Sequence, residues 1–120
     1  MKRLEIFGAT PSPYTQKMLS LLRYKRIPYN IHWGDTRGRL ESLNLDLPKP
    51  VLLPVILFEN EDKELAATTD STPMIRRLEN EHPDRKVIPD DPALAFINYL
   101  LEDFGDEWIT KYMFHYRWHC

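Results

Sequence analysis

The sequence predicts an α/β domain with a mixed four-stranded sheet, followed by a long C-terminal α-helix. In the first 83 residues, apolar runs typical of strands alternate with apolar stripes at helical spacing, in the order strand–helix–strand–helix–strand–strand–helix. The first strand–helix–strand unit predicts parallel strands joined by a right-handed crossover, and the later pair of strands predicts an antiparallel hairpin. From Ala93 to the chain end, apolar residues recur at helical intervals.

The composition is that of a globular protein with one core. The chain has 120 residues, with 16 Lys and Arg against 18 Asp and Glu, and 42% of its residues are hydrophobic. This length is too short for two independent domains. The near-neutral charge excludes a general polyanion binder, so we expect no nucleic-acid partner. No apolar run has the length of a signal peptide or a membrane span, so we expect no membrane partner and a cytoplasmic location.

The first three elements follow from local signals. Residues 4–7 predict a strand. Residues 13–25 carry apolar side chains at helical spacing, with Pro13 at the first helical position and Ser12 at the N-cap. Residues 28–33 predict a second strand.

The next elements form the second half of the sheet. Residues 40–45 predict a short helix. Residues 51–58 are the most apolar run in the chain and predict a buried strand. Pro54 belongs at the start of this strand, because proline cannot donate within a sheet ladder. After a hairpin turn, residues 63–67 predict the returning strand.

Two helices follow the sheet. Residues 70–73 signal a helix start, and Pro83 ends that helix. Residues 84–92 predict a linker, and residues 93–120 predict the first helix of an incomplete all-α domain. The dense aromatic residues at 112–118 support this prediction, because a small α/β domain offers them no partner. Docking of this surface on another chain is the alternative.

Three short motifs resemble the glutathione S-transferase family. Residues 12–17 (SPYTQK) resemble the active-site turn shared by glutaredoxins and glutathione S-transferases, and residues 53–56 (LPVI) resemble the segment that begins the third strand with a cis-proline. Asp70-Ser71 resembles the acidic–serine pair that binds the γ-glutamyl end of glutathione. Residues 96–118 resemble the first helix of the all-helical C-terminal domain. The resemblance implies a thioredoxin-like, glutathione-binding domain over residues 1–83.

The resemblance implies that Ser12 activates the thiol of glutathione. The thiolate is the reactive form, and it is favoured by a hydroxyl that donates a hydrogen bond to sulfur and by the positive end of a helix. From the residues alone, Ser12 is an ordinary capping residue. Some family members use a tyrosine hydroxyl instead, but the periodicity places Tyr14 on the packing face with Met18 and Leu21.

The segment before the third strand is the first candidate for peptide binding. The resemblance implies a cis bond before Pro54, which exposes the backbone of Leu53 to the cysteinyl part of glutathione. It favours Pro54 over Pro50 as the cis residue. The residues alone predict the trans form, because only a minority of bonds before proline are cis.

The start of the last helix of the α/β domain is the second candidate. The resemblance implies that Asp70 binds the γ-glutamyl ammonium, while Ser71 and the helix N–H groups bind the carboxylate. The residues alone also fit an ordinary N-cap. Lys49 is the candidate contact to the glycine end of glutathione.

The implied function is the binding of glutathione and the activation of its thiol for transfer to a small electrophile, in a homodimer. An intact protein of this kind is expected to be a glutathione transferase, whereas this chain lacks most of the helices that form one wall of the electrophile pocket. The alternative is a non-catalytic scaffold for protein interaction or assembly. Glutaredoxin-like redox catalysis is excluded because no cysteine lies near residue 12.

No metal and no cofactor beyond glutathione as co-substrate are expected. His115, His119 and Cys120 have the spacing of metal ligands on a helix. Three such residues at a helix end are weak evidence for a metal centre without further groups to orient them. An aromatic helix is the simpler interpretation of this segment.

Overall fold

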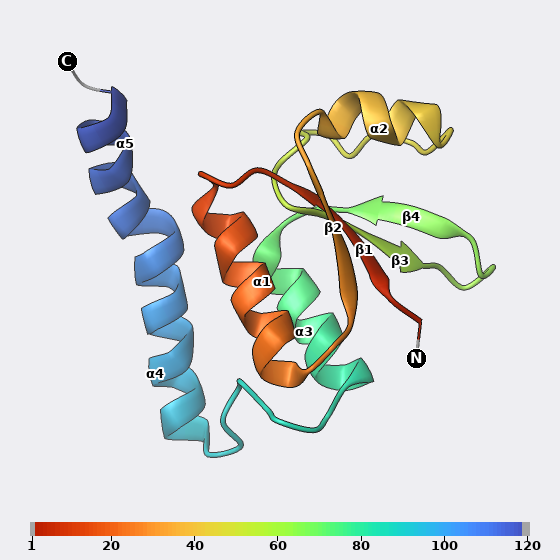
Figure 1. The fold of residues 1–120 in the computed structure, drawn as a ribbon. Helices are drawn as coiled ribbons and strands as arrows, with labels where there is room; N and C mark the ends of the chain where they lie inside the picture. The colour runs from red at the N-terminus through yellow and green to blue at the C-terminus, as the bar shows by residue number, and fades with distance from the viewer. Residues whose placement is uncertain (1, 119–120) are drawn as a thin grey trace. The chain divides into compact units, whose positions relative to one another are not determined.

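The computed structural model describes residues 2–118, and the chain divides after Arg85 into two compact units. The first unit contains, in chain order, β1 (Leu4–Gly8), α1 (Pro13–Lys25), β2 (Tyr29–Trp33), α2 (Thr36–Ser42), β3 (Val55–Glu59), β4 (Leu65–Thr68) and α3 (Ser71–Glu81) (Figure 1). The strands form one sheet in the order β2–β1–β3–β4. β1 is parallel to β2 and antiparallel to β3, and β3 is antiparallel to β4. The predicted mixed sheet is confirmed.

The two faces of the sheet carry different helices. Successive side chains of a strand point to opposite faces. Phe7 and Val55 point to the face covered by α2, where Leu40 packs against them in a buried cluster. Phe58 points to the opposite face, where the guanidinium of Arg77 on α3 lies 4.2 Å from its ring centre. Helices α1 and α3 lie side by side on that face (Figure 1).

The helix predicted over residues 13–25 is confirmed. Pro13 is its first residue, and Ser12 at the N-cap accepts a hydrogen bond from the Thr15 N–H at 3.2 Å. Arg26 ends the helix with φ of 59°, and its N–H binds the last carbonyls of the helix. These are local interactions, which is why the sequence signals sufficed.

Several element boundaries differ from the prediction, and β3 begins at Val55, directly after Pro54, rather than at residue 51. α2 begins earlier than expected, because the Asp35 carboxylate accepts the Gly38 N–H at 3.0 Å and caps the helix there. β4 begins later, because the side chain of Asn60 accepts the N–H groups of Asp62 and Glu64 at 3.0 and 2.9 Å. This side-chain turn holds the hairpin residues out of the ladder.

A buried ion pair joins the last turn of α1 to α3. The Nζ of Lys25 lies 2.5 Å from Oε1 of Glu79, and the Lys25 side chain has no exposed surface. The same ammonium donates to the carbonyls of Asp84 and Arg85 at 3.4 and 3.3 Å. Lys25 therefore also holds the segment in which the first unit ends.

The second unit is a continuous run of three helical segments rather than one regular helix. These are α4 (Pro92–Asp103), the π-helical turn η1 (Phe104–Ile109) and α5 (Thr110–Trp118). Asp91 caps α4 by accepting the Leu94 N–H at 3.0 Å. A π-turn accommodates an extra residue in the helical ladder, which the apolar spacing does not reveal.

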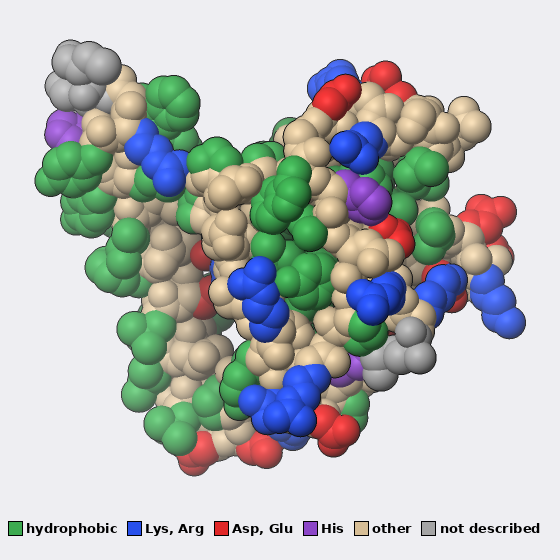
Figure 2. Space-filling view, viewed as in Figure 1, with side chains coloured by type: hydrophobic (Ala, Val, Ile, Leu, Met, Phe, Trp, Pro, Cys, Tyr) green, Lys and Arg blue, Asp and Glu red, His purple; other side chains and the backbone are tan. Residues whose placement is uncertain are grey.

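The described part of the second unit contains no buried residue. Hydrophobic side chains are visible along α4 and α5 (Figure 2), and Tyr116 and Trp118 are 82% and 72% exposed. A helix with apolar residues on several sides is typical of one packed among other helices. The identity of its partner, the predicted helical domain or another chain, remains a prediction. Within residues 2–118, no helix is long and apolar enough to cross a bilayer.

Candidate functional site

The strand topology gathers the predicted site residues, except Lys49, at one edge of the sheet. Phe7 pairs with Val55, and Ile56 pairs with Thr68. Continuing these registers places the end of β1 beside Pro54 and places Pro54 beside Asp70. The turn to α1, the start of β3 and the start of α3 therefore meet at this edge.

Ser12 lies at that edge, at the N-terminus of α1. Its hydroxyl oxygen accepts the Thr15 N–H at 3.2 Å, so the capping interpretation holds. This bond uses a lone pair of the oxygen and leaves the hydroxyl proton to be donated elsewhere. The first N–H groups of a helix also make its N-terminus electropositive. The turn therefore offers a hydroxyl donor beside the positive end of α1.

Thr15, one turn into α1, faces the sheet instead. Its side chain is fully buried, and its hydroxyl accepts the Ala9 N–H at 3.4 Å. Its methyl group occupies the space that a side chain on Gly8 would need. Thr15 therefore sets the distance between α1 and β1. Tyr14 is half-buried on the same helix.

The segment before β3 has two cis peptide bonds, Leu53–Pro54 and Lys49–Pro50. The resemblance favoured a cis bond at Pro54 only, so the second cis bond at Pro50 was not expected, and the trans form that the residues alone predicted is wrong at both positions. Pro54 is fully buried, and Leu53 is half-buried. The Thr69 hydroxyl donates to the Leu52 carbonyl at 2.7 Å, which ties this segment to the residues before α3.

Asp70 and Ser71 occupy the N-terminus of α3. Asp70 is exposed with φ of 78°, and its carboxylate accepts the Thr72 N–H at 3.4 Å. Ser71 is only 5% exposed, and its hydroxyl accepts a hydrogen bond from Nζ of Lys17 on α1 at 3.0 Å. No local signal in the sequence points to Lys17, because the contact joins two helices that are far apart in the chain.

Lys49 is exposed in the segment between α2 and β3. The strand registers that gather the other predicted residues do not extend to it. Its contact with the glycine end of glutathione stays a prediction.

A family model for the N-terminal domain of glutathione S-transferases matches residues 6–86 of this chain. The chain belongs to the glutathione S-transferase family. No curated protein sequence matches it significantly.

Solved structures of the family share the fold. A glutathione S-transferase from Methylobacterium radiotolerans, in complex with glutathione sulfonate, is 26% identical with a TM-score of 0.63, over 79% of this chain and 42% of that one. A glutathione S-transferase from Rhodospirillum rubrum is 18% identical with a TM-score of 0.71, over 90% of this chain and 46% of that one. Maleylacetoacetate isomerase from Anaeromyxobacter dehalogenans, with bound dicarboxyethyl glutathione and citrate, is 15% identical with a TM-score of 0.68. The similarity covers 97% of this chain and 54% of that one. This transferase-family chain thus spans about half the length of these proteins.

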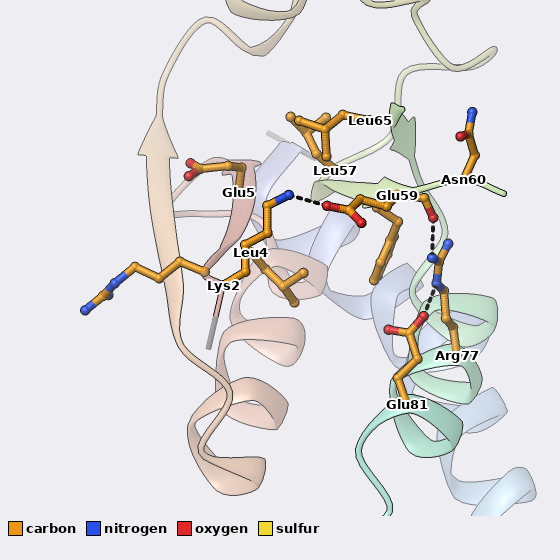
Figure 3. Close-up of a pocket in the computed structure, with 11 residues that line it drawn as sticks. Lys2, Leu4, Glu5, Leu57, Glu59, Asn60, Leu65, Arg77 and Glu81 are labelled. Carbon is orange, nitrogen blue, oxygen red and sulfur yellow. Dashed lines mark hydrogen bonds and ion pairs between the residues drawn. The ribbon is translucent and has the colours of Figure 1, made fainter. Parts of the chain in front are cut away.

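A hollow of about 760 Å³ lies at the opposite end of the sheet, where β1 begins and β3 ends (Figure 3). Four of its charged side chains form ion pairs with one another, Lys2 with Glu59 and Arg77 with Glu81. Lys2 binds the carboxylate of Glu59, and Arg77 donates to the Glu59 carbonyl and to the Glu81 carboxylate, both at 2.7 Å. The hollow is separate from the edge that carries Ser12.

The described residues contain no group of three or more His, Cys, Asp or Glu side chains placed to hold a metal ion. Of the C-terminal residues with ligand-like spacing, His115 lies on α5. His119 and Cys120 lie outside the described residues.

A polar cluster lies on the face of the sheet that carries α2. Oε2 of Glu5 is 2.5 Å from Nε2 of His32, and Asn30 donates to the other carboxylate oxygen at 2.8 Å. The His32 ring stacks on Phe7 with ring centres 4.8 Å apart. Burial raises the pKa of Glu5, but the hydrogen bonds from His32 and Asn30 and the charge of His32 together lower it further, so the net shift is downward.

We predict that this cluster contributes to stability at neutral pH and less in acid. The pKa of Glu5 in the folded state lies below its ordinary value of 4.5. Its contribution is therefore complete above that value and is lost as the pH falls through the folded pKa. Both side chains are about one-third exposed, so the effect should stay below about 1 kcal/mol.

Urea unfolding between pH 3 and pH 7 measures this contribution, with roughly half-unit steps at the acid end. Glu5→Gln should reduce the loss of stability on acidification, whereas the exposed hairpin variant Glu61→Gln should follow the wild type. If Glu5→Gln and the wild type lose stability in parallel, the carboxylate contributes nothing specific.

Proposed function

We propose that this chain binds glutathione at the sheet edge where α1, β3 and α3 begin, and that Ser12 stabilises the thiolate of the bound peptide. The observation that carries the proposal is the convergence of Ser12, Pro54 and Asp70 through the strand registers. For the intact protein, we propose transfer of glutathione to a small electrophile by a cytoplasmic homodimer.

The proposed chemistry is ionisation of the thiol followed by nucleophilic attack. The thiol releases its proton to solvent, and the sulfur then forms a bond to the electrophilic atom of the substrate. The Ser12 hydroxyl donates a hydrogen bond to the sulfur, which favours the charged form. The positive end of α1 acts in the same direction. This chemistry requires no metal and no cofactor besides glutathione.

The proposed peptide site has three parts. The backbone N–H and C=O of Leu53 bind the cysteinyl residue as a short added strand, beside the buried Pro54. Asp70 binds the γ-glutamyl ammonium, while Ser71 and the N–H groups of α3 bind the γ-glutamyl carboxylate. Lys49 binds the carboxylate of the glycine end.

Titration of the full chain with glutathione, followed by backbone amide NMR, tests the binding site. We expect saturable shifts centred on residues 12–16, 53–55 and 70–72. Saturable shifts at the hollow around Glu59 instead would contradict the location of the site. A folded sample without shifts at millimolar glutathione would contradict binding. It would favour a scaffold role, for which the exposed aromatic residues of α5 are the supporting observation.

Ser12→Ala tests the role of the hydroxyl. We expect the pKa of the bound glutathione thiol to rise by about one unit, which corresponds to a tenfold lower thiolate fraction below that pKa. Ultraviolet absorbance of the thiolate against pH measures this shift. Ser20→Ala is the matched control, because Ser20 is exposed on the same helix and donates to the Gln16 carbonyl at 2.8 Å. An unchanged thiol pKa in Ser12→Ala would leave Ser12 as a capping residue only.

A further inference from the structure

Lys17 links the two helices that begin at the proposed glutathione site. It lies on α1, and its Nζ is 3.0 Å from the hydroxyl oxygen of Ser71, the first residue of α3. Ser71 is 5% exposed, and Lys17 is half-buried. The contact therefore places an ammonium group beside the N-terminus of α3.

This contact orients the hydroxyl of Ser71. An ammonium group is a donor only, so the Ser71 oxygen accepts in the bond with Lys17. The hydroxyl proton then points away from Lys17 and is available to an acceptor at the start of α3. An incoming carboxylate would accept hydrogen bonds from this hydroxyl and from the backbone N–H of Ser71, and the ammonium of Lys17 would lie nearby.

Two opposite charges thus lie at the start of the same helix. Asp70 supplies an exposed carboxylate, and Lys17 supplies the ammonium one residue further along α3, at Ser71. A carboxylate ligand near Asp70 alone would meet a like charge, which raises the free energy of binding. The pair instead complements a zwitterion, in which an ammonium and a carboxylate are attached to the same carbon.

We propose that Lys17 is a positioning residue that makes this site selective for the α-carboxylate of the γ-glutamyl end. The proposal rests on the function proposed above and adds the specificity of one subsite. Lys17 acts partly through Ser71, by holding its hydroxyl as a donor, and partly through its own charge.

The test compares two ligands on four forms of the full chain. The ligands are glutathione and 4-aminobutyryl-cysteinyl-glycine, which keeps the ammonium but lacks the α-carboxylate. The proteins are the wild type, Lys17→Met, Lys17→Arg and Lys63→Met. Lys63→Met is the matched control, because Lys63 is an exposed lysine in the β3–β4 hairpin at the opposite end of the sheet. Isothermal titration calorimetry gives Kd for each combination.

We expect Lys17→Met to weaken glutathione binding about tenfold and to leave the binding of the analogue nearly unchanged. Lys17→Arg should restore most of the affinity for glutathione, and Lys63→Met should bind both ligands like the wild type. This pattern would locate the effect of Lys17 at the carboxylate.

Two outcomes would overturn the inference while the proposed function stands. The first is an equal loss of affinity for both ligands in Lys17→Met, which indicates a structural role. The second is an unchanged affinity of Lys17→Met for glutathione. A third outcome, a folded wild type that binds neither ligand, would overturn the proposed function together with the inference.

Discussion

Lys25→Met is expected to lower the free energy of unfolding by about 3–5 kcal/mol. The Lys25 side chain has no exposed surface, and the Glu79 side chain is 10% exposed. Methionine fills nearly the same space but removes the ammonium group that lies beside the nearly buried Glu79 carboxylate. Removing one partner of a buried pair is costly for this reason, even where the intact pair contributes little net stability.

The decrease in the free energy of unfolding should have a second cause, because Lys25 also donates to the carbonyls of Asp84 and Arg85. These carbonyls lie in the segment that ends the first unit. We therefore expect amide hydrogen exchange to accelerate there as well as in α1 and α3.

Chemical unfolding of the full chain, followed by circular dichroism, measures the change. Lys25→Met/Glu79→Leu should recover much of the loss, because neither charge then remains buried. Lys2→Met is the control for an exposed ion pair and should change stability far less than Lys25→Met. If Lys25→Met matched Lys2→Met in its effect, the burial of the Lys25–Glu79 pair would have no energetic consequence.

Gly8→Ala is expected to lower the free energy of unfolding by about 1–3 kcal/mol. A methyl group at this position would lie 2.5 Å from Cγ2 and 2.8 Å from Oγ1 of Thr15. Thr15 is β-branched and fully buried, so its side chain has no free rotamer to move into. The conflict is relieved only by a shift of α1 away from β1, and this shift also moves Ser12.

The contact is tested by a double-mutant cycle with Thr15→Ala. Because both substitutions act on one space, Gly8→Ala/Thr15→Ala should be less destabilised than the sum of the single variants. Gly105→Ala is the control, because a methyl group at Gly105 meets no described atom within 4 Å and alanine favours a helix. Additive effects in the cycle would show that Gly8 and Thr15 do not compete for space.

Local signals account for the parts of the fold that the sequence predicted well. Pro13 and the capping hydroxyl of Ser12 act within the first turn of α1, so the residues that define this turn are neighbours in the chain. The start of α2 was predicted too late, although its signal is equally local, because Asp35 reaches only to Gly38. The π-turn within the second unit has no comparable signal, because apolar spacing tolerates one extra residue in a turn.

The candidate site shows the same difference between local signals and tertiary contacts. The resemblance of short motifs to the family selected Ser12, Pro54 and Asp70 as candidates, whereas the residues alone fitted ordinary helix caps and a trans proline. Their meeting at one edge depends on strand registers, and a slip of one residue would turn the strands' side chains to the other face. The contacts of Lys17 with Ser71 and of Lys25 with Glu79 depend on how α1 packs against α3. Helix caps and turns depend on residues that are neighbours in the chain, so the sequence predicts them. Contacts between distant residues form only after the sheet has brought the helices together.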